Sequence, residues 1–243
     1  MKKFLDPKIL PWFTMGAGGL GLVLRLWLFS ATDEKGLLPA KHPAIALSLI
    51  LTVLVLAILF LCTRKLPPIA KYSRLYPAGI GRGIGCIVAA VGFLFGGLHF
   101  MGGIGGLGIV TFAASFAAAL CMVFLALVRI KGARPAMVLH TIPTVFLMLF
   151  LVCNCRIWGS EPQMQIYLFP LFACVLLMLA GYYLTVLSVR KGSRQWLVFL
   201  SQSALFFCCL SLPGENKLFY LAMVIYLALD LCFVGNLRQP EER

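Results

Sequence analysis

The chain has 243 residues, of which 61% are apolar and only 12% charged, and its mean hydropathy is +0.98. Soluble domains carry about 25% charged residues, so this composition excludes an ordinary soluble protein. The formal net charge of +13 would suit nucleic acid, but the basic residues lie in short segments between apolar runs, which excludes a basic nucleic-acid-binding surface. We therefore expect an all-α fold, a polytopic transmembrane helix bundle.

Eight apolar runs follow one another along the chain, each long enough to cross a bilayer core about 30 Å thick. Proline and glycine separate them, as at Pro67-Pro68 and Pro213-Gly214. Because only short segments join the runs, residues 1–243 are predicted to form a single integral membrane domain. The predicted spans are 9–30, 43–63, 80–99, 104–129, 136–157, 164–188, 195–212 and 217–236.

Lysine and arginine are distributed unevenly over the two sides that these spans define. Sixteen lie on the side that holds both chain ends, four lie on the other side, and Arg25 lies inside the first span. Positive residues collect in cytoplasmic loops, so both termini are predicted to be cytoplasmic. The four tryptophans agree, because Trp12 and Trp196 fall at inner span ends and Trp27 and Trp158 at outer ones, where indole rings favour the headgroup level.

The segments RLWLF (25–29) and RIWGS (156–160) share an Arg-x-Trp pattern near the outer ends of the first and fifth spans. An arginine there can extend its guanidinium to lipid phosphates and act as a membrane anchor. The alternative is an outward-facing pocket for a zwitterionic or anionic small molecule or a lipid headgroup, because acidic residues that can pair with arginine follow both motifs. The predicted ligand-binding residues are Arg25, Asp33, Glu34, Arg156 and Glu161.

The two Arg-x-Trp motifs also suggest an internal repeat. Each occurs in the first helix of a set of four spans, and an acidic residue follows each motif. Because each set has an even number of spans, both halves would have the same orientation, as parallel repeats do. The pattern predicts a 4+4 parallel repeat, although little other residue similarity joins the halves.

Asp230 lies inside the last span, within YLALDLCFVG. An acid in a membrane span is costly and marks a functional position, so one interpretation is ion or proton coupling. The other interpretation places Asp230 near the inner interface, paired with a basic loop residue or a backbone group. The histidines His42, His99 and His140 are scattered over both sides and predict no metal site.

Glycine is concentrated in one region, with 12 of the 23 glycines between residues 79 and 108. The segment GIGGLG (103–108) matches the GxGxxG pattern, but it follows an apolar helix rather than a strand, so it predicts no dinucleotide site. Pairs such as Gly92 and Gly96 instead have the spacing that lets membrane helices approach closely. We expect such faces to pack neighbouring helices or to dock another membrane protein.

The segment RIWGSEPQMQIYLFPLFACVLLMLAGYY, from Arg156 to Tyr183, resembles a pattern in an uncharacterised family of small bacterial multi-pass membrane proteins. The stretch from Arg25 to Pro43 resembles the front of the same proteins, and Gly159 stands where their pattern has serine. The resemblance implies a multi-pass protein of the bacterial plasma membrane. It implies no activity, ligand or cofactor.

Three functions are compatible with these patterns. The first is a membrane protein of the transporter kind that binds a small molecule or a lipid headgroup, and the second is a structural or regulatory subunit that binds a membrane protein partner. The third is a membrane-embedded enzyme that modifies lipids, for which the sequence offers no catalytic motif. No cofactor, metal ligand or nucleic-acid partner is predicted, and the lipid bilayer is the expected surrounding.

Overall fold

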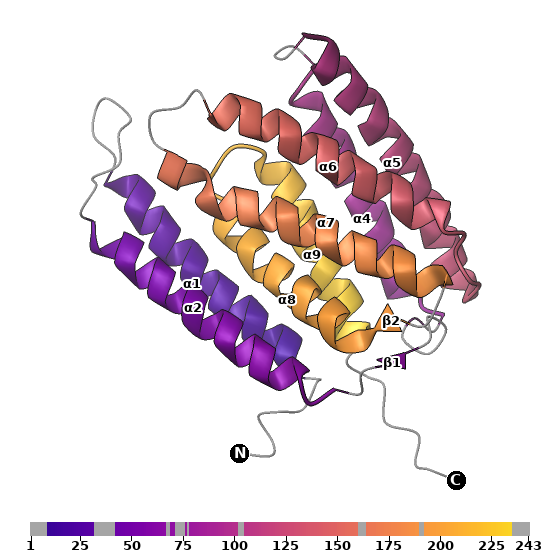
Figure 1. Cartoon of the computed structure of the whole chain (residues 1–243), viewed down its shortest axis with the longest axis horizontal. Helices are drawn as coiled ribbons and strands as arrows, with labels where there is room; N and C mark the ends of the chain where they lie inside the picture. The colour runs from indigo at the N-terminus through magenta and orange to yellow at the C-terminus, as the bar shows by residue number, and fades with distance from the viewer. Residues whose placement is uncertain are drawn as a thin grey trace.

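The computed structural model describes residues 9–31, 42–66, 69–70, 76, 78–101, 105–159, 164–189 and 192–234 (Figure 1). Within these ranges the chain forms eight α-helices, one short 3₁₀ helix (η2, Met164–Tyr167) and two two-residue strands (β1, Ile69–Ala70, and β2, Gly192–Ser193). The helices are α1 (Leu10–Ser30), α2 (Pro43–Thr63), α4 (Ile80–Leu98), α5 (Gly105–Lys131), α6 (Val138–Trp158), α7 (Leu168–Val189), α8 (Arg194–Ser211) and α9 (Lys217–Val234).

The all-α prediction is confirmed, and each of the eight predicted apolar runs overlaps one of these helices. Helices α1, α2 and α8 begin where a local cap or proline favours it. The side chain of His42 accepts a hydrogen bond from the amide of Ala44 before α2, and Ser193 caps α8 by accepting from the amide of Trp196. The largest difference lies at α7, which begins four residues after the predicted start because residues 164–167 form η2.

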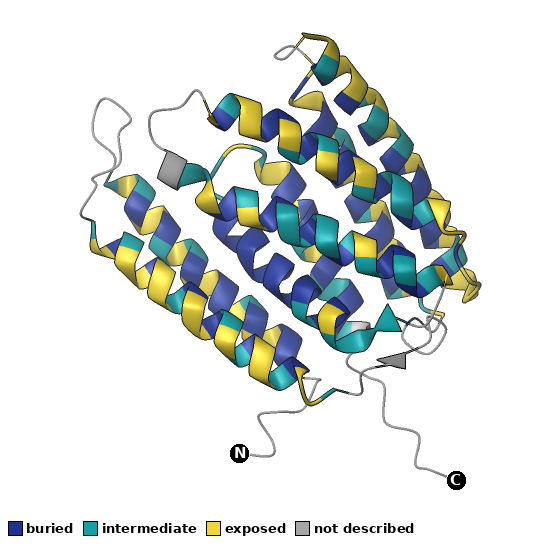
Figure 2. Ribbon diagram, in the orientation of Figure 1, coloured by how far each residue is buried: buried dark blue, intermediate teal, exposed yellow. Residues whose placement is uncertain are grey.

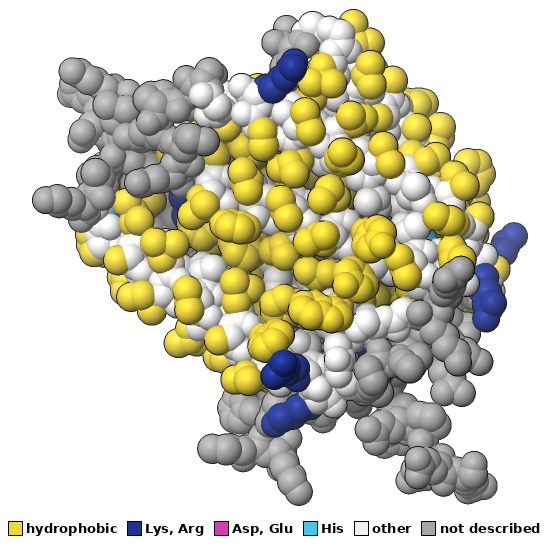
Figure 3. Space-filling model, viewed as in Figure 1, with side chains coloured by type: hydrophobic (Ala, Val, Ile, Leu, Met, Phe, Trp, Pro, Cys, Tyr) yellow, Lys and Arg dark blue, Asp and Glu magenta, His cyan; other side chains and the backbone are white. Residues whose placement is uncertain are grey.

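Six helices of the described chain are long and apolar enough to cross a membrane: α1, α2, α4, α5, α6 and α7. Their outward faces carry exposed leucine, isoleucine, valine and phenylalanine side chains, and Figure 3 shows apolar side chains covering one broad face of the bundle, with lysine and arginine near the helix ends. A soluble monomer rarely exposes so large an apolar surface. The fold is therefore that of a multi-pass membrane protein.

Helix α8 forms the centre of the bundle. It packs against α1, α2, α7 and α9, and it is buried over nearly its whole length, whereas α1 and α2 expose one side each (Figure 2). On the other side of the bundle α4 packs between α5 and α9, and α6 lies between α5 and α7. Because α8 contacts protein on most sides, it can carry buried polar residues such as Gln202 without exposing them to lipid.

Glycine on α4 allows the close packing on this second side. A Cβ added at Gly92 would lie 2.5 Å from the Cβ of Ala222 on α9, and one added at Gly97 would overlap the hydroxyl of Ser115 on α5. Gly96 lies against Phe219 and Phe150. These glycines therefore pack helices of the same chain, so a docking surface for another protein would have to lie elsewhere.

The two ends of the bundle differ in what they contain. At one end α1 begins and α9 ends, and β1 pairs antiparallel with β2, with Ile69 opposite Ser193 (Figure 1). At the opposite end α1, α6 and α8 finish while α7 and α9 begin. This second end is the one that the sequence predicts to face outward, and it contains the cavity described next.

Candidate functional site

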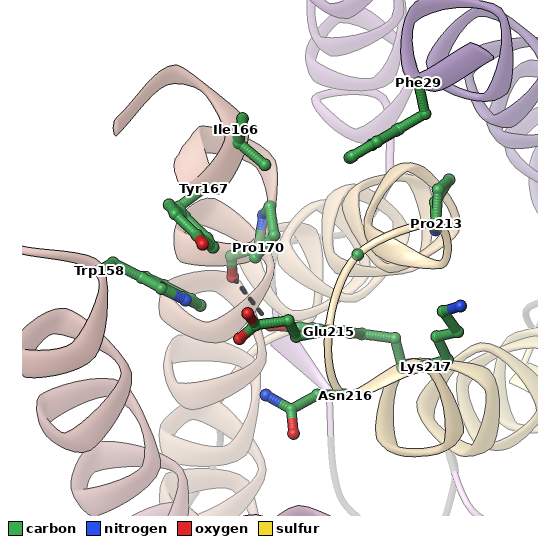
Figure 4. A pocket seen from close by; sticks show the side chains of 11 residues that line it. Phe29, Trp158, Ile166, Tyr167, Pro170, Pro213, Glu215, Asn216 and Lys217 are labelled. Atoms are coloured by element: carbon green, nitrogen blue, oxygen red, sulfur yellow. Dashed lines mark hydrogen bonds between the residues drawn. The ribbon is translucent and has the colours of Figure 1, made fainter. Parts of the chain in front are cut away.

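A cavity of about 370 Å³ lies where the ends of α1, α6 and α8 meet the starts of α7 and α9 (Figure 4). Its volume falls near the lower end of the roughly 300–1,000 Å³ that is typical of small-molecule sites. The lining residues come from five parts of the chain: Phe29, Trp158, Ile166, Tyr167, Pro170, Pro213, Gly214, Glu215, Asn216, Lys217 and Tyr220. Four of these eleven residues are aromatic, and the two charged ones lie on the α8–α9 turn.

One wall of the cavity is a stacked aromatic pair. The rings of Trp158, at the end of α6, and Tyr167, in η2, lie 5.1 Å apart with an interplanar angle of 16°. Trp158 is only 3% exposed, and its indole Nε1 has no hydrogen-bond partner among the described residues. Because the indole N–H can only donate, a buried tryptophan at the wall of a cavity lacks an acceptor that a bound molecule could supply.

The opposite wall is the turn between α8 and α9. Glu215 and Lys217 are exposed at this turn, and Asn216 between them adopts a left-handed backbone conformation with φ of 51°. The side-chain amide of Asn216 donates to Oδ1 of Asn154 on α6, at 3.4 Å. This contact ties the turn to α6, the helix that also carries Trp158.

The same turn borders a second cavity. It also measures about 370 Å³ and is lined by Phe95, His99, Leu218, Phe219 and residues 214–217. Here Nε2 of His99 lies 3.9 Å from Oε2 of Glu215. The turn therefore separates two cavities, and its charged side chains border both of them.

Pro170, near the start of α7, also lines the cavity. Proline has no N–H, so it cannot donate to the carbonyl four residues earlier, that of Ile166. Arg25 on α1 donates from Nη2 to this carbonyl at 2.9 Å, and the hydroxyl of Tyr220 donates to the carbonyl of Pro170 at 3.4 Å. Side chains from two other helices thus bond to the start of α7.

Arg25 is buried rather than extended to the membrane surface. It is 2% exposed, and its guanidinium lies about 5 Å from the ring centroids of Phe29 and Phe169. It is not among the residues that line the cavity, but two of its contacts, Phe29 and Ile166, are. Arg25 therefore holds two lining residues in place without itself bordering the cavity.

The other predicted site residues are distributed differently. Arg156 is exposed on α6, on the turn that precedes Trp158. Asp33, Glu34 and Glu161 lie outside the described residues. Arg25 therefore contacts residues of the cavity wall without lining the cavity itself. The motif that contains Arg156 contributes Trp158 to that wall.

Asp230 lies at the opposite end of the bundle, in a buried ion pair. Its Oδ1 is 2.7 Å from Nη1 of Arg129, in the last turn of α5, and the two residues are 6% and 3% exposed. The guanidinium of Arg129 also lies over the rings of Tyr76 and Tyr226, at 4.8 and 5.8 Å. The partner of Asp230 is a basic residue, but it belongs to a helix rather than to a loop.

The residues that sequence reasoning missed are Tyr167, Glu215, Asn216 and Tyr220. The segment LPGENK (212–217) was interpreted only as a break between two spans. A signal was present, because a Pro-Gly turn needs neither an acid nor an asparagine, and acidic residues are rare in this chain. The described residues contain no cluster of three or more side chains suited to hold a metal ion.

Comparisons with known proteins add no family to this geometry: the chain matches no family model, no curated protein and no solved structure.

Proposed function

We propose that this membrane protein binds a small polar molecule or a lipid headgroup in the cavity beside Trp158, and that it acts as a transporter or as a subunit of one. The observation that supports this proposal is the buried indole N–H of Trp158, which has no partner among the described residues and lies at the wall of a cavity of about 370 Å³. A donor desolvated in this way costs about 1–3 kcal/mol unless an acceptor binds it. Nε1 is covered by protein atoms in this structure, so a ligand with a suitable oxygen would recover that cost when the Trp158 side chain turns toward the cavity.

The proposal can be tested by native mass spectrometry of protein extracted in a mild detergent. Wild type should retain a small mass, and Trp158→Phe, which keeps the ring but removes the N–H, should retain less of it. Arg156→Ala is the matched control, because this exposed side chain belongs to the same helix end but does not line the cavity. Retention that is equal in all three proteins, or absent from wild type, would contradict the proposal.

We propose further that the cavity faces outward and that both chain ends are cytoplasmic, in a bacterial plasma membrane. The distribution of basic residues supports this orientation, because Arg64, Lys65, Lys131, Arg134 and Arg194 lie at helix ends away from the cavity. Cys155 is exposed near the cavity end of α6. A membrane-impermeant maleimide should label Cys155 on intact cells, and Cys155→Ser should remove that label. Labelling only after the membrane is permeabilised would reverse the orientation.

All eight helices are proposed to cross the membrane, including α8 and α9. Each has 18 residues, which at 1.5 Å per residue gives about 27 Å, close to the thickness of the hydrocarbon core. The 4+4 repeat stays a prediction. In the second half α7 packs against both of its neighbours in that half, α6 and α8. Its counterpart in the first half, α2, packs against α1 of its own half and against α8 of the other half.

A role for Asp230 in ion or proton coupling would require its pair with Arg129 to open. Because both side chains are buried, separating them without a replacement partner is costly. A proton or a cation bound to Asp230 would lower that cost, which is how coupling could operate. If it does, Asp230→Asn should remove the pH or cation dependence of ligand binding while the protein still folds.

The alternative, a subunit that binds another membrane protein, predicts a stoichiometric partner on co-purification. The variants that test it should avoid Gly92 and Gly96, because these glycines pack against residues of the same chain. Substitution of exposed lipid-facing residues, such as Ile109 and Phe116 on α5, is the suitable test. Loss of the partner in those variants, with ligand retention unchanged, would favour the alternative.

A further inference from the structure

We propose that the ligand of this cavity is a zwitterion, with an ammonium group that binds Glu215 and an anionic oxygen that binds Lys217. This inference rests on the proposed function and adds the chemical class of the ligand to it. It follows from the types of polar group on the walls and from where they lie. The nature of each group restricts what can be bound beside it.

The carboxylate of Glu215 accepts hydrogen bonds and attracts a cation. It lies at the cavity with aromatic neighbours, the stacked Trp158–Tyr167 pair and Tyr220. Trp158 and Tyr220 are 3% and 1% exposed, and one face of Trp158 is stacked on Tyr167, so the carboxylate rather than a ring face is the group that attracts a cation here. In Figure 4 the indole of Trp158 and the carboxylate of Glu215 extend toward the same space from opposite sides. An ammonium group in that space would contact the carboxylate of Glu215, while the N–H edge of the indole would contact a neighbouring oxygen of the same ligand.

The ammonium of Lys217 requires the opposite kind of partner, an anionic oxygen. In Figure 4 its side chain extends away from Trp158, toward Pro213. Lys217 and Glu215 are therefore separated across the turn, although both line the cavity. A simple anion would meet Glu215, and a simple cation would meet Lys217, so each would gain one charge contact and suffer one repulsion. A molecule with both charges gains two contacts.

The indole N–H of Trp158 supplies the third requirement. It only donates, and its nitrogen is covered by protein atoms in this structure, so once the Trp158 side chain turns toward the cavity it selects a ligand oxygen near the ammonium end, such as a hydroxyl, ester or phosphate oxygen. An ammonium, an intervening oxygen and an anionic group occur together in phospholipid headgroups and in their water-soluble counterparts. The same chemistry can therefore reach the cavity from the bilayer or from solution.

The experiment uses the full chain in nanodiscs of phosphatidylglycerol, which has no ammonium group. Three probes are titrated by calorimetry: glycerophosphocholine, choline, and glycerol phosphate. Because glycerophosphocholine satisfies both charges, it should bind at least about tenfold more tightly than either of the other two. Nanodiscs of phosphatidylcholine form the second arm. If the natural source is lipid, titration with glycerophosphocholine should vanish there, and wild type should retain phosphatidylcholine in native mass spectrometry.

Four variants assign the contacts. Glu215→Gln should weaken glycerophosphocholine and choline about tenfold and leave glycerol phosphate unchanged or tighter, whereas Lys217→Gln should weaken glycerophosphocholine and glycerol phosphate and spare choline. Trp158→Phe should weaken glycerophosphocholine about fivefold, as expected for one hydrogen bond. Arg156→Gln is the control and should change every affinity less than twofold. Glu215 and Lys217 are exposed, so their variants should fold.

Two results would overturn the ligand class and leave the proposed function intact. One is glycerol phosphate binding as tightly as glycerophosphocholine, with Glu215→Gln strengthening both, which would mark an anion site. The other is no binding of any probe or of phosphatidylcholine, while protein from cells retains a different mass that Trp158→Phe loses. If no probe binds and no mass is retained, the proposed function fails as well.

Discussion

The two Arg-x-Trp motifs have the same spacing and lie at the same end of the bundle, yet the arginine is the buried residue in one and the tryptophan in the other. In the first motif the arginine is buried and the tryptophan exposed, with Arg25 2% and Trp27 47% exposed. In the second motif Arg156 is exposed and Trp158 is buried. A sequence pattern that occurs twice therefore does not place its residues in equivalent environments.

The buried member of each motif contacts the same short segment. Arg25 donates to the carbonyl of Ile166, and Trp158 stacks on the ring of Tyr167, the next residue. The segment at the start of α7 thereby joins α1 to α6. This shared partner explains why one end of the bundle has an organised cavity, and it suggests which substitutions will separate the two motifs.

The largest effect on stability should come from the buried ion pair between Arg129 and Asp230, at the opposite end of the bundle. Arg129 is as buried as Arg25 but pairs with a carboxylate, Asp230, instead of a carbonyl. Removal of one partner from a buried ion pair costs about 3–5 kcal/mol, so Asp230→Ala should lower the free energy of unfolding by that amount. Equilibrium unfolding in mixed detergent micelles measures it. A loss below that for Arg25→Ala would show that the carbonyl holds its arginine more tightly than the carboxylate does.

Trp158→Ala should have the next largest effect. A fully buried tryptophan costs about 3–5 kcal/mol when it is truncated, and we expect the lower half of that range because Trp158 borders a cavity. Trp27→Ala should cost about 1 kcal/mol or less, because Trp27 is half exposed and loses mainly an edge contact with His42. Unfolding followed by circular dichroism compares the two. Equal losses would contradict the difference between the motifs.

For the two arginines we expect the opposite order, with the larger loss of unfolding free energy in the first motif. Arg25→Ala leaves a gap beside Phe29 and Phe169 and removes the donor to Ile166, so we expect a loss of about 2–3 kcal/mol. Arg156→Ala, at an exposed position, should stay within about 0.5 kcal/mol of wild type. The same unfolding assay measures both. A larger loss for Arg156→Ala would mean that lipid contacts, rather than burial, dominate at this end.

The smallest effect is a coupling between Arg25 and Pro170. Pro170→Ala supplies a backbone N–H that can donate to the carbonyl of Ile166, so Arg25→Ala should cost about 1 kcal/mol less in that background than in wild type. A double-mutant cycle of unfolding free energies measures the difference. Additive losses would show that Arg25 stabilises the protein through its ring contacts alone.

The helices were predictable from the sequence to within a few residues at nearly every boundary. Runs of apolar residues, proline breaks and capping residues such as Ser193 are local signals, and a membrane span has little freedom in length. The exception was the start of α7, where η2 replaces the first predicted turn. Hydropathy cannot distinguish a 3₁₀ turn from an α-helical one, because both use the same residues.

The candidate site was predictable only in part. Arg25 was singled out for its charge, but its burial depends on a carbonyl that lies 141 positions later in the chain. Glu215 and Tyr167 were not identified, because their contribution to a cavity depends on α6, α7 and α9 meeting at one end. The partner of Asp230, Arg129, lies 101 positions away, at the end of a different predicted span.

The sequence by itself determined the class of protein and the positions of the helices, and it singled out Arg25 and Asp230 as charged residues inside predicted spans. It could do so because hydrophobic length and charge are properties of short segments. Only the tertiary structure decided which of two matching arginines is buried, that Asp230 is paired, and that a turn with a glutamate and a lysine closes a cavity against Trp158. The physical reason is that burial and pairing depend on neighbours supplied by packing between distant helices, and a local pattern carries no information about them.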